Sequence, residues 1–298
     1  MALKVLLIPD SYGWAYDFYA LGLKKSSRHD ITVIPVSPPG TITSKTIEYH
    51  DVIFCFSRWV WDDLGADKRR QVGEKPNIMW CCGSYYKDPP PEIDRFALCT
   101  ERLMEKAKDS GITNTVLLRE GVDTNDYRPF DKTPSEELRV GWAGNSSRPI
   151  KRAHLLTSLK YPVKIKSDHD IQTRVKNRSP TRMVEFYNSL DVYVTLMAQN
   201  GAHGVGRTVL EAMSCGLPVI ATNIASTAKA VPKRWLIFEK NEGAIVRRAN
   251  RKLEILDKDR DLLAEVGRAN REFIIKNYSW TVIGREWDRV FEEVAALH

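Results

Sequence analysis

The stretch DVYVTLMAQNGAHGVGRTVLEAMSCGLPVIAT, residues 191–222, decides the fold. Residues 192–196 are an apolar run rich in β-branched side chains, which is typical of a buried strand. A glycine-rich turn follows, and we expect a helix from about Arg207 that ends at Gly216 and Pro218, directly before a second apolar strand. Two buried strands joined by one helix form a βαβ unit, so the stretch predicts a parallel sheet covered on both faces.

The turn before this helix predicts an anion site. Gly204 and Gly206 allow positive φ and close backbone approach, and the free amides and dipole of a helix start suit a diphosphate. A dinucleotide fingerprint would need its third glycine at Val209, which argues against that class. A tight connection without a ligand remains the alternative.

The same alternation of short apolar runs and helical segments extends over the chain and indicates α/β architecture with two doubly wound parallel sheets. A polar stretch with two prolines, 126–134, separates the two series and suits a linker. We therefore expect domains at 1–133 and 134–280, and a terminal helix over 281–298. The expected strands are 5–8, 31–36, 52–56, 77–80, 96–99, 116–118, 139–142, 163–165, 192–196, 217–221 and 235–238.

Composition and charge narrow the class of partner. The chain has 298 residues, enough for two cores, with 43% hydrophobic and 28% charged residues. Residues 1–133 carry 18 Lys and Arg against 19 Asp and Glu, whereas residues 134–298 carry 27 against 19. A basic second half favours an anionic partner: a nucleotide diphosphate, a nucleic acid or a membrane surface.

The cysteines and the hydropathy point to a cytoplasmic protein. Five cysteines, with no C-x-x-C spacing, argue against a disulfide framework and against a zinc site. No apolar run approaches the ~20 residues that a spanning helix needs, and residues 1–8 are interpreted as a first strand rather than a leader. We expect neither a metal ion nor a cofactor.

Four segments carry a family resemblance, and along the chain they stand in the order that this family has. They are 204–219 (GVGRTVLEAMSCGLPV), 121–129 (GVDTNDYRP), 140–151 (VGWAGNSSRPIK) and 279–281 (SWT). They resemble the donor-binding signature, the end of the first domain, the first strand and loop of the second domain, and the C-terminal tryptophan segment of glycosyltransferase family 4. This is the retaining group with the GT-B fold. The resemblance spans residues 96–298 and implies two Rossmann-like domains facing across a cleft, with the terminal helix crossing back to the first.

The resemblance also implies roles for single residues. Glu211 stands where the family holds the ribose hydroxyls, Lys151 where it grips the diphosphate, and Gly204, Val205, Gly206, Arg207 and Thr208 where the phosphates rest. The alternative for Glu211 is an acidic residue near the start of the helix that only interacts favourably with the helix dipole. Two positions depart from the family: His203 replaces its first glutamate and Asn145 replaces an arginine. Arg148 or Arg207 could supply the missing cation. The catalytic candidates are thus Lys151, His203 and Arg207.

The first domain offers fewer signals. Tyr12, Gly13 and Trp14 follow the first strand, where the family's glycine-rich loop approaches the acceptor, and the two aromatic rings suit a sugar or a base. The family's histidine after a later strand has no counterpart here, and Ser84, Tyr85 and Tyr86 occupy that region instead.

Taken together, the sequence predicts retaining transfer of a sugar from a UDP- or GDP-sugar to a hydroxyl acceptor, without a metal ion. We expect the acceptor to be a sugar or a lipid-linked sugar, and peripheral contact with a membrane stays open. Two alternatives remain: a DNA glycosyltransferase that acts on a hydroxymethylated base, and a nucleotide-sugar-binding protein that has lost catalysis.

Overall fold

A computed structural model describes residues 1–83, 86–131, 135–167, 181–198, 204–224 and 226–298. The chain forms two compact units. The first comprises Met1–Gly121, Ala202–Gly204 and Trp280–His298, and the second comprises Val122–Gly201 and Val205–Ser279. Each unit has its own hydrophobic core.

The first unit is built on a six-stranded parallel sheet in the order β2-β1-β3-β4-β5-β6. Its inner strands carry consecutive apolar residues that are all buried, as expected where helices cover both faces of a sheet. The strands are β1 (Lys4–Ile8), β2 (Asp30–Val33), β3 (Val52–Cys55), β4 (Asn77–Cys81), β5 (Arg95–Leu98) and β6 (Thr115–Leu117).

Helices follow the strands of this sheet, and several start at side-chain caps. Thr43, Ser57 and Thr100 each accept a backbone N–H at the start of the helix that follows, which satisfies one of its free amide groups. The helices are α1 (Ala15–Ser26), α2 (Ser44–Tyr49), α3 (Arg58–Asp63), α4 (Ala66–Gly73), α5 (Glu101–Asp109) and, from the far end of the chain, α11 (Trp280–Ala295).

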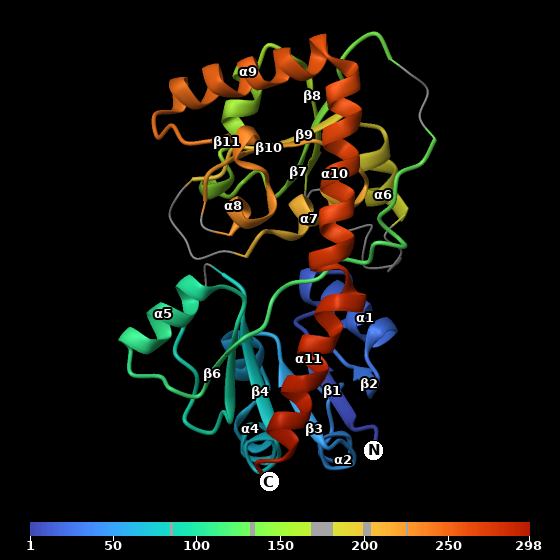
Figure 1. Ribbon diagram of the computed structural model, residues 1–298. Coiled ribbons are helices and arrows are strands. Elements are labelled where there is room, and N and C mark those ends of the chain that lie inside the picture. Colours follow the sequence, from blue (N-terminus) through green and yellow to red (C-terminus); the bar gives the residue numbers. More distant parts are fainter. Residues whose placement is uncertain (84–85, 132–134, 168–180, 199–203, 225) are drawn as a thin grey trace. The chain divides into compact units, whose positions relative to one another are not determined.

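Helix α11 completes the core of the first unit, where it lies across the sheet next to α1 (Figure 1). Trp287 is fully buried against Phe54 and Trp80, with ring centroids 4.9 and 5.4 Å away. Its indole Nε1 donates to the Arg119 carbonyl at 3.0 Å. Trp280, at the start of the helix, fills the space that Gly22 leaves on α1, because a Cβ there would lie 2.0 Å from its Nε1.

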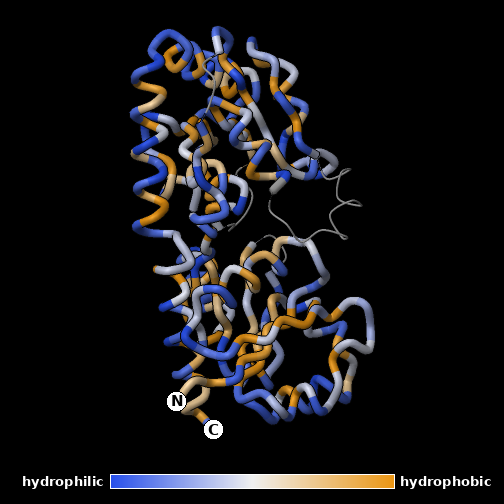
Figure 2. Tube along the Cα trace, turned by 90° about the vertical axis from the view of Figure 1, so that its right-hand side faces the viewer, coloured by the Kyte–Doolittle hydropathy of each residue, from blue (hydrophilic) through white to orange (hydrophobic). Residues whose placement is uncertain are grey.

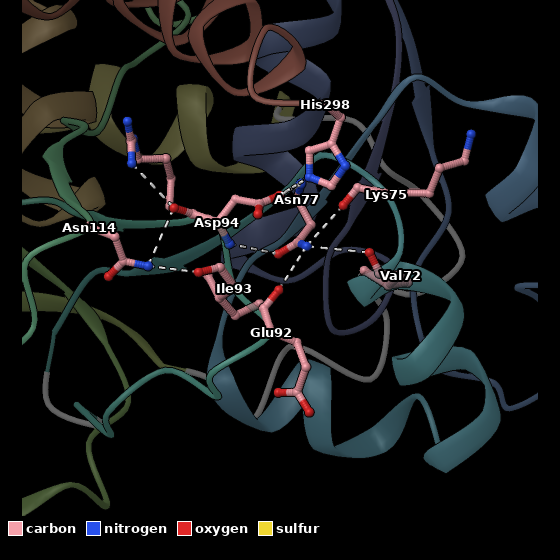
Figure 3. A network of polar contacts seen from close by, with 9 residues as sticks. Val72, Lys75, Asn77, Glu92, Ile93, Asp94, Asn114 and His298 are labelled. Carbon is pink, nitrogen blue, oxygen red and sulfur yellow. Dashed lines mark hydrogen bonds and ion pairs between the residues drawn. The ribbon is translucent and has the colours of Figure 1, made fainter.

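A buried asparagine organises the amino ends of β4 and β5, the edge opposite to the one where ligands bind in such sheets (Figure 3). The Asn77 amide donates to the carbonyls of Lys75 and Glu92 at 3.0 Å each and to that of Val72 at 3.4 Å. Asp94 accepts from the Asn77 backbone N–H at 2.9 Å and contacts the His298 ring at 3.0 Å. We interpret this network as structural, since its donors and acceptors hydrogen-bond to one another.

The second unit is built on a five-stranded parallel sheet in the order β11-β10-β9-β7-β8. Its strands are β7 (Val140–Gly144), β8 (Val163–Ser167), β9 (Val192–Thr195), β10 (Val219–Thr222) and β11 (Leu236–Ile237). Its helices are α6 (Thr181–Asn188), α7 (Arg207–Ser214), α8 (Thr227–Ala230), α9 (Glu242–Lys258) and α10 (Arg260–Tyr278), with 3₁₀ turns η1 (Pro149–Lys151), η2 (Ala153–Ser158) and η4 (Lys233–Trp235).

The proline-containing stretch after residue 121 is attached to the second unit rather than spanning open space. The Tyr127 carbonyl accepts from Ser214 Oγ at 2.5 Å and from Arg271 Nη1 at 3.1 Å. Asn188 holds the next residues, since its Oδ1 accepts from the Phe130 N–H at 2.7 Å and its amide donates to the Arg128 carbonyl. The contact boundary therefore lies at 121/122, earlier than the residue 133 expected from the prolines.

The two doubly wound parallel sheets predicted from the alternating pattern are confirmed, and all eleven expected strands have counterparts. Hydrophobic residues concentrate along the strands, whereas hydrophilic and hydrophobic residues alternate along the long helices (Figure 2). In the described part of the chain, no helix combines the length and the apolar character needed to cross a membrane.

Candidate functional site

Most of the candidate residues that the sequence predicts in the second unit lie at the carboxyl edge of its sheet. The strand order reverses between β7 and β9, and ligands in open parallel sheets bind beyond the carboxyl ends of the strands at such a point. Lys151, in the turn η1 after β7, contacts the loop after β9: its Nζ lies 3.6 Å from Met197 Sδ. The neighbouring backbone joins the same loops, since the Ala198 N–H donates to the Ile150 carbonyl at 2.8 Å.

The loop between β7 and Lys151 is shaped by Asn145. Its Oδ1 accepts from the Ser147 N–H at 2.9 Å and from the Ser147 hydroxyl at 2.5 Å, an Asx turn. The Arg148 N–H faces the Asn145 carbonyl at 3.4 Å, so Arg148 extends this turn, and its side chain is half-buried. Asn145 thus holds the loop that presents Lys151, and any cation in place of the family's arginine has to come from another residue.

The glycine turn leads into α7 as the sequence predicts. Gly206 has φ of 92°, in the region that glycine favours, and precedes Arg207, the first helical residue. Thr208 hydrogen-bonds the buried Tyr193 hydroxyl, which also donates to the Ala143 carbonyl at 3.0 Å. The start of α7 is thereby tied to the end of β7.

Gly204 and Val205 are both buried. A Cβ at Gly204 would lie 2.4 Å from the carboxyl carbon of Glu120, so no larger residue fits there without displacing that group. Glu120 is itself buried and accepts from the Tyr19 hydroxyl at 3.4 Å. His203, the predicted catalytic histidine, lies outside the described residues, as do Ser84 and Tyr85.

Glu211 is the centre of a buried polar network at α7. Its Oε2 accepts from the Tyr187 hydroxyl at 2.8 Å, and its Oε1 pairs with Arg207 Nε at 2.5 Å. Arg207 Nη2 in turn donates to the Tyr127 hydroxyl at 3.3 Å. Burial, followed by the Glu211 carboxylate, raises the pKa of both Tyr187 and Tyr127, so both phenols keep their protons. The motif alone pointed to Glu211 and Arg207, whereas the two tyrosines appear only in the structure.

The first unit places Tyr12, Gly13 and Trp14 directly after β1. Gly13 has φ of 75°, and its N–H donates to the buried Asp17 carboxylate at 2.8 Å. Trp14 is 44% exposed and therefore available to a ligand, while Tyr12 is half-buried. This loop stands at the carboxyl edge of the first sheet, where the strand order reverses between β1 and β3.

Asp10, at the head of this loop, is a residue that the sequence analysis did not single out. Its Oδ1 is buried without a hydrogen-bond partner, and burial raises the pKa of its carboxyl above the ordinary value. Behind it, Tyr16 accepts from Cys82 Sγ at 3.6 Å, and burial raises the pKa of both groups. A carboxylate at a strand end followed by aromatic residues was the available signal.

No group of three or more His, Cys, Asp or Glu residues that could hold a metal ion occurs among the residues described by the structure.

Comparisons with known proteins agree with this picture. Residues 134–258 match the family model described as Glycosyl transferases group 1, so the resemblance read from the motifs is confirmed for that part of the chain. A phosphatidyl-myo-inositol mannosyltransferase from Propionibacterium freudenreichii is 29% identical over an alignment of 199 residues, and the match covers 59% of this chain and 49% of the relative. The chain thus spans about half the length of that relative.

Solved structures share the fold over nearly the whole chain. A glycosyltransferase from Rickettsia africae superposes with a TM-score of 0.71 at 14% identity, covering 98% of both chains. An α-glucosyltransferase in complex with UDP and a 13-mer DNA containing an HMU base superposes with a TM-score of 0.66 at 10% identity, covering 98% of this chain and 100% of that one. These similarities establish the GT-B fold.

Proposed function

We propose that this chain is a retaining glycosyltransferase that moves a hexosyl group from a UDP- or GDP-sugar to a hydroxyl acceptor without a metal ion. The observation that carries the proposal is the set of groups along the carboxyl edge of the second sheet: Lys151 beside the loop after β9, the amide-bearing start of α7, and the Arg207–Glu211 pair. Cations and free helix amides are the groups that bind a diphosphate. The family match covers this same region.

The proposed reaction forms no covalent bond between the sugar and the protein. The bond between the anomeric carbon and the diphosphate oxygen breaks, the acceptor oxygen bonds to that carbon on the same face, and the departing phosphate takes the acceptor proton. The side chains then supply positioning and stabilise the charge that develops on the diphosphate. Lys151, Arg148 or Arg207, and the amides after Gly206 are the groups we assign to that task.

For the acceptor, we propose a sugar or a lipid-linked sugar. The curated relative is named for a mannosyl group and a lipid-linked inositol, whereas the structural relative holds DNA. The charge of the first unit favours the saccharide acceptor over DNA, since residues 1–121 and 280–298 carry 18 Lys and Arg against 20 Asp and Glu. A polyanionic acceptor calls for a basic surface, which that balance does not provide.

The donor assignment is tested by Lys151→Ala. A thermal-shift comparison of UDP, GDP and their sugars identifies the nucleotide first, because a ligand that binds only the folded state raises the melting temperature. The variant should then lose about 1.5–3 kcal/mol of nucleotide affinity in calorimetry, the range for a hydrogen bond to a charged group. Lys160→Ala, which removes an exposed lysine paired with Glu254, is the matched control and should bind normally. Equal affinity in both variants contradicts the assignment.

Catalysis is tested with radiolabelled sugar on the identified nucleotide. Label released to water or transferred to a glycoside separates an enzyme from a binding protein that has lost catalysis. Transfer to hydroxymethylated DNA, lost on Tyr12→Ala or Trp14→Ala, would replace the saccharide acceptor by a nucleic acid. DNA binding that disappears at physiological salt, with no transfer, agrees with the proposal.

A further inference from the structure

The Glu211 carboxylate is covered by Arg207. The glutamate side chain is 2% exposed, while that of Arg207 is 20% exposed. A carboxylate has lone pairs for further donors, yet at this exposure no ribose can reach it beside the guanidinium. Tyr187 holds the other oxygen from the interior of the unit, at 2.8 Å. Arg207, which is partly exposed, is thus the contact of this carboxylate that borders solvent.

Arg207 is also the first residue of α7, directly after the Gly206 turn. Its guanidinium therefore starts within one side-chain length of the amides that would hold the phosphates. Nη2 contacts the Tyr127 hydroxyl at 3.3 Å, so the guanidinium is fixed at two points, on Glu211 and on Tyr127. A guanidinium is equally suited to a carboxylate and to a phosphate, since its fork of donors matches both.

We propose that Arg207 is an exchangeable cation: donor binding moves its guanidinium from Glu211 to the diphosphate, and the ribose hydroxyls take its place on the carboxylate. This rests on the proposed function, because it assumes a nucleoside diphosphate donor. The exchange keeps every buried charge compensated. Glu211 trades an ion pair for two hydroxyl donors, and Arg207 trades a carboxylate for a phosphate.

The exchange makes the site selective for nucleotides that carry a diphosphate. A nucleoside alone displaces Arg207 from Glu211 but offers the guanidinium no anion. Its binding free energy is therefore reduced by the full free energy of the lost ion pair. Breaking a buried pair without a replacement partner is costly, which disfavours nucleosides as competitors. Arg207 thus acts as a specificity residue, and Tyr127 as a positioning residue that sets where the guanidinium rests.

The inference predicts effects of opposite sign on two ligands. In Arg207→Ala, UDP affinity should fall at least tenfold, because the phosphate loses a cation. Uridine affinity should rise two- to tenfold, because nothing then covers Glu211. Both are measured on the full chain, UDP by calorimetry and uridine by NMR titration, with GDP and guanosine in their place if GDP is the nucleotide that binds. Tyr127→Phe should also raise the affinity for uridine, by a smaller factor than Arg207→Ala.

Two further variants keep the test decisive. Arg207→Lys retains the charge and should fold normally, with UDP affinity between the wild type and Arg207→Ala, so it replaces the alanine variant if that variant melts too low to assay. Arg247→Ala removes an exposed arginine of α9 and should leave both ligands unchanged. If Arg207→Ala loses affinity for both UDP and uridine, or for neither ligand, the proposed exchange is wrong. The assignment of the donor site is not affected by either result. A wild type that binds neither UDP nor GDP overturns the proposed function instead.

Discussion

Replacing Trp287 by alanine tests whether α11 belongs to the core of the first unit. The indole is fully buried among Phe54, Phe56 and Trp80. Truncating a core tryptophan costs about 3–5 kcal/mol. The Arg119 carbonyl, which accepts from Nε1 at 3.0 Å, also loses its donor, at about 1 kcal/mol for a partly buried acceptor. The sum, about 4–6 kcal/mol, is comparable with the whole stability of many domains.

Hydrogen exchange followed by mass spectrometry locates the effect. Peptides from β3 and β4 should exchange at least several hundredfold faster in Trp287→Ala, since each 1.4 kcal/mol is a factor of about ten. Peptides from β9 and β10, in the second unit, should change far less. Trp287→Phe keeps a ring in place and should lose only about 1–2 kcal/mol. Unchanged protection of β3 and β4 in the alanine variant would refute the packing argument.

Two further changes probe the first unit. Asn77→Ala leaves three carbonyls, those of Val72, Lys75 and Glu92, without their shared donor, and should lower the free energy of unfolding by about 2–3 kcal/mol in urea titrations. A midpoint equal to that of the wild type would contradict the network in Figure 3. Asp10→Asn should raise the melting temperature near neutral pH, and the gain should vanish below the ordinary carboxyl pKa of 3.8. The reason is that a carboxyl whose pKa is raised on folding contributes stability while it is protonated and loses that contribution as the pH rises through the folded value. A gain in melting temperature that does not vary with pH counts against a carboxyl whose pKa is raised by burial.

The fold follows from the sequence because its signal is local. Runs such as Val192–Thr195 are continuous, apolar and β-branched, and helical segments separate them, so strand identity and parallel pairing need no long-range information. The Gly206 turn and the start of α7 are also read from adjacent residues. Even the Asx turn at Asn145 has a local signature, an asparagine before two serines.

Contacts between distant residues could not be predicted in this way. Tyr127 and Tyr187 come from a loop and from α6, and only the tertiary structure brings both to Glu211. The prolines near residue 130 suggested an interdomain linker, but they gave no sign that Ser214, Asn188 and Arg271 bind that backbone from three helices of the second unit. Propensity records which residues break helices and strands, and it carries no information on what lies next to the break.

The return of α11 to the first unit has a consequence for synthesis on the ribosome. Residues 1–121 leave the ribosome with the surface that Trp287 and Phe291 later cover still exposed. At about 5–20 residues per second, α11 follows only after roughly 10–30 s. The sheet of Val122–Ser279 can meanwhile close from residues already translated. The second unit is therefore the first able to finish folding, and the nascent first unit is the natural client for a chaperone that holds exposed apolar surface.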